Sequence, residues 1–195
     1  MRIFKINIVS IMSILGLIAI SPVNAQTSGD DPVDQMKKGG SILMIRHAFA
    51  PGKGDPHNFK IGDCSTQRNL DDRGRAQAKA IGDWLRSKGI QKAKVYSSQW
   101  CRYLETAKLI DIGIVTELPA LNSFFDRPQD REPNIRALRT FIAKQPIDGE
   151  LIILVTHFVT ISAIAQQAVS SGEGVVLKTA EESSLAIVGR LNFGF

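Results

Sequence analysis

Short, uninterrupted apolar runs alternate with longer segments of helical periodicity along residues 41–190. Residues 41–45 (SILMI) and 151–155 (LIILV) are apolar without alternation, which is typical of strands buried on both faces. Shorter strands are expected at residues 94–97 (KVYS), 112–116 and 185–190 (LAIVGR). Strands of this kind, separated by helices, predict an α/β fold: a three-layer α/β/α sandwich on a mostly parallel sheet.

The segments between these strands are predicted to be helical. The helices are expected at residues 72–88, 99–111, 133–144 and about 158–169. Gly89 is a natural C-cap for the first, and Pro133 suits the first turn of the third. A Gly/Pro-rich insertion, residues 51–63 (PGKGDPHNFKIGD), separates the first strand from the first helix. The loops that follow the strands of such a sheet collect at one edge, where ligands bind.

The N-terminal segment does not share this pattern. Two basic residues precede an apolar run at residues 6–20, which ends in Pro22 and the small residue Ala25. An N-terminal membrane anchor is the alternative, because the run approaches the length of a membrane span. The proline break and the polar residues that follow favour cleavage. Residues 1–25 are therefore interpreted as a signal peptide, and residues 26–195 as a periplasmic or secreted domain with no stable membrane anchor.

The charge distribution favours a small anionic ligand. The formal net charge is +5, and it falls to +3 without residues 1–25, which hold two positive charges and no negative ones. Charges of both signs are intermixed, and no Lys/Arg-rich block with interleaved aromatic residues occurs. A basic pocket is expected, and a nucleic-acid partner is not.

The chain has two cysteines, Cys64 and Cys101. An even pair in an oxidising compartment predicts a disulfide, and two separate buried thiols are the alternative. The spacing predicts no zinc site, because neither C-x-x-C nor a Cys/His cluster occurs. If the cysteines pair, the bond ties the insertion to the floor of the pocket.

Basic side chains stand at or just after the ends of three predicted strands. Arg46 and His47 end the first, Arg102 comes shortly after the second, and His157 ends the central one. Guanidinium groups match phosphoryl oxygens with paired hydrogen bonds, and a neutral imidazole is a good nucleophile. The pattern indicates phosphoryl transfer to His47, with the arginines and a protonated His157 stabilising the charge.

Four ordered segments carry a resemblance to a known family: ILMIRHA, RNLDDRGRAQAKAIGDWL, VYSSQWCRYLETAKL and LIILVTHFVT. Together they resemble the histidine phosphatase superfamily, also called phosphoglycerate-mutase-like. The resemblance implies an α/β/α sandwich and a catalytic set of Arg46, His47, Arg102 and His157. It also implies that no metal or organic cofactor is needed.

The resemblance fails at the general acid. One branch of the family places a Glu where this chain has Ser123, and the other places Asp or Glu where it has Phe158. The remaining candidates are Asp55, Asp63, Asp126 and Glu173, of which Glu173 and Asp63 are ranked first. The absence of any donor is also consistent with a substrate that has a good leaving group, such as a phosphohistidine or an acyl phosphate.

These observations predict an exported phosphatase that hydrolyses a phosphomonoester through a phosphohistidine on His47. The alternative is a non-catalytic protein that binds phosphorylated ligands. Arg68 is a further candidate for substrate contact, with a surface salt bridge as its alternative. The expected partner is a phosphorylated small molecule, and resemblance to small exported members suggests an envelope sugar phosphate.

Overall fold

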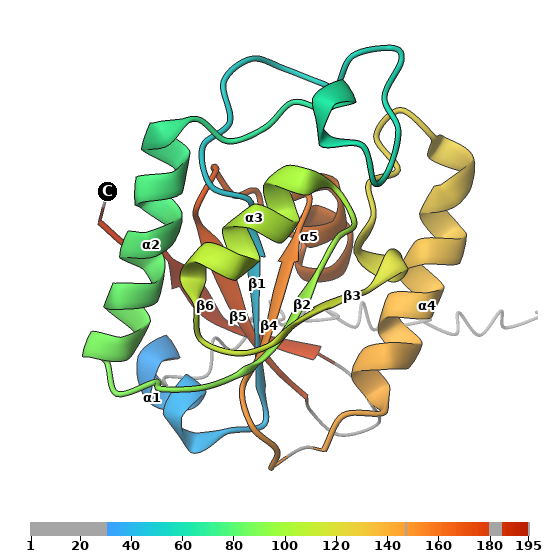
Figure 1. The fold of residues 1–195 in the computed structure, drawn as a ribbon. Coiled ribbons are helices and arrows are strands. Elements are labelled where there is room, and N and C mark those ends of the chain that lie inside the picture. The colour runs from blue at the N-terminus through green and yellow to red at the C-terminus, as the bar shows by residue number, and fades with distance from the viewer. Residues whose placement is uncertain (1–30, 147, 180–184, 195) are drawn as a thin grey trace, which may run out of the picture.

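The computed structural model describes residues 31–146, 148–179 and 185–194 (Figure 1). The predicted signal peptide lies outside these residues. Within the described ranges, no helix is long and apolar enough to cross a membrane.

A six-stranded sheet of order β3-β2-β4-β1-β5-β6 forms the centre of the molecule. The strands are β1 (Ser41–Arg46), β2 (Lys94–Ser97), β3 (Val115–Glu117), β4 (Ile152–Thr156), β5 (Gly174–Thr179) and β6 (Leu185–Leu191). β1, β2, β3 and β4 pair in parallel, whereas β5 is antiparallel to both β1 and β6. The predicted mostly parallel sheet is confirmed.

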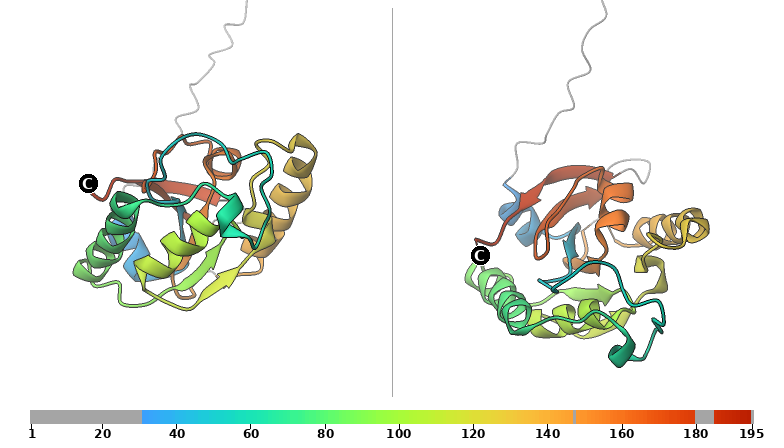
Figure 2. Two further views of the ribbon diagram at one scale, coloured as in Figure 1. Left: turned by 45° about the horizontal axis from the view of Figure 1, so that its top comes forward. Right: turned by 90° about the horizontal axis from the view of Figure 1, so that it is seen from above.

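Helices cover both faces of the sheet. They are α1 (Pro32–Lys38), α2 (Asp72–Ser87), α3 (Cys101–Ile110), α4 (Arg131–Ala143) and α5 (Phe158–Ala165), with short 3-10 helices η1 (Cys64–Thr66), η2 (Pro119–Leu121) and η3 (Pro128–Asp130). Seen from above, α2 and α3 lie on one side of the sheet and α4 and α5 on the other (Figure 2). The predicted three-layer sandwich is therefore confirmed.

Alternate side chains of each strand point into two separate cores. In β1, Leu43 and Ile45 pack with α2 and α3, whereas Ile42 and Met44 pack with α4 and α5. Both faces of the sheet are therefore buried, which explains why the sequences of its central strands are continuous apolar runs.

Several observed boundaries differ from the predicted ones, and α1, β5 and the three short 3-10 helices were not predicted. Helix α5 ends at Ala165, not near residue 169, because Gln166 adopts a left-handed conformation (φ 53°). β3 starts at Val115, three residues later than expected, and α4 starts two residues before Pro133. α1 is a short, mostly polar helix capped by Asp31. β5 is reached from α5 by a loop alone, without the crossover helix by which a parallel strand would be recognised.

Helices α2 and α3 approach each other closely at Gly82. A Cβ atom added there would lie 2.1 Å from the carbonyl oxygen of Ile110, a distance that requires backbone to move. A glycine inside a helix costs stability, so its presence here is explained by close packing.

We predict that Gly82→Ala destabilises the protein although alanine is the better helix former. Helix propensity alone would add about 1 kcal/mol. The clash with Ile110 should outweigh this and lower the free energy of unfolding by roughly 2 kcal/mol. Ala76→Gly on the exposed face of α2 is the control, with an expected loss of about 1 kcal/mol. Urea unfolding measures both, and a Gly82→Ala protein more stable than the parent would show that the helices are not in contact here.

Candidate active site

A cavity of about 270 Å³ opens at the carboxyl edge of the parallel strands. The lining brings together all four residues predicted for catalysis: Arg46, His47, Arg102 and His157. The other lining residues are Gly52, Lys53, Gly54, Asp55, Arg68, Tyr103, Ser123, Phe125, Asp126 and Phe158. The structure therefore brings the four side chains from three strand ends into one cavity.

The orientation of His47 is set by the backbone that follows it. Its Nδ1 lies 2.5 Å from the carbonyl oxygen of Ala48, an acceptor, so Nδ1 carries the proton and donates. The Ala48 amide in turn donates to Thr106 Oγ1 at 3.0 Å, which holds this turn on α3. In the neutral ring, Nε2 therefore keeps its lone pair.

His47 is held in that neutral form. Burial lowers its pKa well below 6.5, and the positive charges of Arg102, Arg46 and Arg68 lower it further, against the opposing effect of the Ala48 hydrogen bond. An unprotonated nitrogen in a cationic pocket is what nucleophilic attack on a phosphate requires.

The tautomer of His157 follows from a chain of hydrogen bonds. The Gln99 amide donates to Asn122 Oδ1 at 3.0 Å, which identifies that atom as the oxygen. Ser98 Oγ donates to the same oxygen at 3.2 Å, and it has only one proton. His157 Nε2, 2.8 Å from Ser98 Oγ, must therefore donate to it.

Burial, followed by the charge of Arg102, also lowers the pKa of His157 well below 6.5. His157 is therefore neutral in the free protein, with its proton on Nε2. Burial and the positive charge of the nearby Arg102 disfavour, in the free protein, the protonated form expected from the sequence. A nearby anion favours the protonated form of an imidazole, so an anion in the cavity would raise the pKa of His157.

Tyr103 lies between the two histidines and was not singled out from the sequence. Its ring meets the His47 ring edge-on at 4.7 Å and lies 3.8 Å from the His157 ring, centroid to centroid. Burial raises the pKa of Tyr103 to about 12, so it stays neutral. Its position within the motif, directly after Arg102, was the available signal.

Arg46 lines the cavity, and one of its buried donors is unsatisfied. Its Nη1 donates to the carbonyl oxygen of Val169 at 3.2 Å, and its backbone amide donates to that of Glu173 at 3.0 Å. Its Nε is buried and has no hydrogen-bond partner. A buried N–H without an acceptor is costly, and the charge of this guanidinium favours an anion in the cavity.

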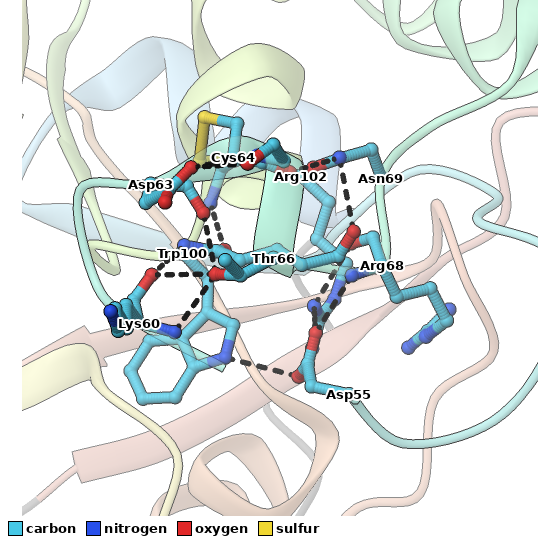
Figure 3. The surroundings of a disulfide bond; sticks show 12 residues. Asp55, Lys60, Asp63, Cys64, Thr66, Arg68, Asn69, Trp100 and Arg102 are labelled. Atoms are coloured by element: carbon cyan, nitrogen blue, oxygen red, sulfur yellow. Dashed lines mark hydrogen bonds and ion pairs between the residues drawn. A yellow bond between two sulfur atoms is a disulfide. The ribbon is translucent and has the colours of Figure 1, made fainter. Parts of the chain in front are cut away.

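Arg102 is engaged by a carboxylate of the insertion. Its two terminal nitrogens bind the two oxygens of Asp55 at 2.7 and 3.0 Å, a bidentate pair. Trp100 Nε1 and the Arg68 amide donate to the same carboxylate at 3.1 and 3.0 Å. Figure 3 shows Asp55 reached by Trp100 on one side and Arg102 on the other. Burial alone would raise the pKa of Asp55, but the hydrogen bonds and charge of Arg102 hold it below its usual value.

The predicted disulfide is present between Cys64 and Cys101 (Figure 3). Their Cα atoms are 5.6 Å apart and 37 residues separate them in sequence. Closing a loop of that length stabilises the fold by about 4 kcal/mol on a chain-entropy model. Because Cys101 directly precedes Arg102, the bond anchors the end of the insertion beside the Asp55–Arg102 pair.

Arg68 lines the cavity, and within the described residues it forms no surface salt bridge of the kind considered as its alternative. It donates to the carbonyl oxygens of Gly54 and Ala50 at 2.8 and 2.7 Å, which shapes the loop over the cavity.

The two residues ranked first as proton donors lie outside the cavity lining. Glu173 accepts from the Ser170 amide at 2.8 Å and pairs with Arg190 at 3.0 Å. Asp63 is exposed and caps η1, and hydrogen bonds from Ser65 lower its pKa, the opposite of what a proton donor needs. Asp126 does line the cavity, next to Ser123.

Comparison with known proteins agrees with this geometry. The family model for the histidine phosphatase superfamily (branch 1) matches residues 42–122. The mitochondrial serine/threonine-protein phosphatase Pgam5 of Drosophila virilis is 38% identical over 74 residues, which cover 38% of this chain and 23% of that protein. The chain thus matches about a quarter of the length of this curated relative.

Solved structures show the same fold. The protein histidine phosphatase SixA, complexed with tungstate, superimposes with a TM-score of 0.59 at 11% identity, covering 78% of this chain and 97% of SixA. A mycobacterial glucosyl-3-phosphoglycerate phosphatase with inorganic phosphate gives 0.55 at 16% identity, covering 76% and 94%. Together with the family-model match over residues 42–122, these results show that the chain has the fold of the histidine phosphatase superfamily.

We predict that Asp55→Asn destabilises the protein in a pH-dependent way. Because the pKa of Asp55 is lowered on folding, the pair stabilises fully above about pH 3.8 and is lost as the pH falls below it. At pH 7 the variant should lose about 3 kcal/mol of unfolding free energy, since Arg102 is left buried and unpaired. The loss should shrink toward pH 3. Asp126→Asn, on an exposed side chain, is the control, and an equal loss at every pH would contradict the ion-pair explanation.

A second prediction concerns the His157 tautomer. In Ser98→Ala, Nε2–H loses its acceptor, so ¹⁵N NMR should show His157 shifting from pure Nε2–H toward a mixture of tautomers, while His47 is unchanged. Ser97→Ala is a matched control, because Ser97 Oγ bonds the carbonyl oxygen of Ser98 and not the ring. A His157 spectrum identical to the parent's in Ser98→Ala would mean that another group sets the tautomer.

Proposed function

We propose that this protein is a phosphomonoester hydrolase that acts through a phosphohistidine on His47. The observation that carries the proposal is the free Nε2 of a buried, neutral imidazole, held by its Nδ1 bond to Ala48 and surrounded by three arginines. The match of residues 42–122 to the histidine phosphatase family model and the phosphatase activities named for the similar proteins support the proposal.

The reaction takes two displacements. His47 Nε2 attacks phosphorus, the P–N bond forms, and the bond to the leaving oxygen breaks with its electron pair. Water then attacks phosphorus, the P–N bond breaks, and phosphate leaves as Nε2 recovers its lone pair. Arg46, with its unpaired buried Nε, and the nearby charges of Arg102 and Arg68 stabilise the transferring group.

Arg102 takes part only by sharing its donors. Its terminal nitrogens are bound to Asp55, whereas its Nε is buried without a partner. A phosphoryl group can take the terminal donors if Asp55 yields them. The carboxylate thereby keeps the arginine oriented while the cavity holds no phosphate.

For substrates that need a proton donor we propose Asp126. Of the four candidates from the sequence, Asp55 and Asp126 line the cavity, and Asp55 is held ionised by Arg102. Asp126 lies three residues after Ser123, which occupies the position of the family's usual Glu and also lines the cavity.

We propose further that the protein is exported and acts on a phosphorylated small molecule, for which an envelope sugar phosphate and an aryl phosphate are the competing classes. The Cys64–Cys101 disulfide supports an oxidising compartment. The solved relatives include a phosphatase named for glucosyl-3-phosphoglycerate, a sugar phosphate derivative. A non-catalytic phosphate-binding role remains the competing hypothesis, and it predicts binding without turnover.

The test is hydrolysis of an activated aryl phosphate by residues 26–195, produced with the disulfide formed. His47→Ala should lower kcat/KM by roughly 10³-fold or more. His57→Ala is the comparison, because His57 is exposed in the insertion and lines a neighbouring cavity but not the one around His47, so its loss should be less than tenfold. Because His47 stays neutral, the parent's rate should not fall as the pH drops through 6.5. Phosphate binding with no turnover in the parent would favour the binding protein.

A further inference from the structure

Two large apolar side chains are exposed at the mouth of the catalytic cavity. Phe125 is 60% exposed and Phe158 is 41% exposed, and both line the cavity. Their ring centroids are 5.8 Å apart with the planes inclined at 57°. Exposed phenylalanine rings that converge on a cavity mark a ligand surface more often than chance placement.

The Phe158 ring lies next to the expected position of the phosphoryl group. Phe158 directly follows His157, and the guanidinium carbon of Arg46 lies 5.4 Å from the Phe158 ring centroid. An ester group attached to phosphorus at His47 therefore has a phenylalanine face beside it. Phe125 comes from a different segment, the loop after η2, so the surface is built by two parts of the chain.

The cavity around His47 adjoins another cavity on the side of the insertion. A second cavity of about 310 Å³ shares Gly54, Asp55, Ser123 and Asp126 with the first. Its wall includes the stacked rings of Phe59 and Trp100, 4.8 Å apart. A leaving group larger than a few atoms thus meets further aromatic surface along the insertion.

The absence of the family's usual carboxylic acid also favours a substrate with an aromatic leaving group. Neither position of the family's carboxylic acid holds one here, since they are Ser123 and Phe158. A phenol has a pKa of ~10, compared with ~16 for water, so a phenolate departs with far less help from an acid. At position 158, this chain has a phenylalanine in place of the family's Asp or Glu, so an aromatic ring stands where the acid would be.

We infer that the substrates of this site are phosphate esters of phenols, with the aromatic ring of the leaving group packed on Phe125 and Phe158. The inference rests on the proposed function and names its substrate class. His47 Nε2 bonds to phosphorus, the aryl–O–P bond breaks at phosphorus, and the phenolate leaves with the electron pair and takes a proton from solvent. Aromatic contacts of this kind provide both affinity and orientation.

The experiment compares three substrates: 1-naphthyl phosphate, phenyl phosphate and acetyl phosphate, the last having a good leaving group but no ring. In Phe125→Ala and in Phe158→Ala, kcat/KM for naphthyl phosphate should fall about tenfold, that for phenyl phosphate less, and that for acetyl phosphate less than twofold. Phe158→Leu, which keeps apolar volume beside Arg46, should show the same order of losses. Ile114→Ala is the control, because Ile114 is 91% exposed and lines neither cavity.

The outcomes separate this inference from the proposed function. Equal losses for all three substrates, no loss for any, or faster hydrolysis of an alkyl sugar phosphate than of naphthyl phosphate would overturn the aryl specificity while His47-dependent turnover stands. Absence of His47-dependent turnover on every substrate would overturn the proposed function itself. Free phosphotyrosine and a phosphotyrosyl peptide distinguish a small-molecule source of the phenol from a protein, and selective losses on either in the phenylalanine variants support the inference.

Discussion

The parallel pairing of β1 with β4 is the constraint on which the site depends. In this register Arg46 lies opposite Thr156, so the next residues, His47 and His157, leave the sheet side by side. Both strands are buried on both faces, and a slip of one residue would turn each apolar side chain toward the wrong core. The sheet therefore holds the two imidazoles in place, and Tyr103 fills the space between them.

Electrostatics then determines the state of those imidazoles. Burial and nearby arginines keep both neutral, and hydrogen bonds to Ala48 and Ser98 fix their tautomers. The positive charge that favours a phosphate would be costly in an unoccupied site, and Asp55 offsets part of it on Arg102. The disulfide beside Arg102 secures the insertion that supplies this carboxylate.

The sequence was informative where chemistry follows directly from local pattern. Apolar runs predicted β1, β2 and β4, and the strand ends predicted the four residues that meet in the cavity, because parallel strands share a carboxyl edge. The Asp55–Arg102 pair could not be predicted, since it depends on how a Gly/Pro-rich insertion folds back over the sheet. The same holds for the neutral state of His157, which is set by enclosure and not by spacing.

The most direct test of the account is the atom of His47 that carries phosphate. The protein is mixed rapidly with an aryl phosphate and quenched, and the phosphorylated site is located by tandem mass spectrometry and ³¹P NMR. Because Nδ1 is committed to the Ala48 carbonyl oxygen, the account predicts phosphate on His47 Nε2. Phosphate on Nδ1 or on His157, or turnover without any phosphoenzyme, would contradict it.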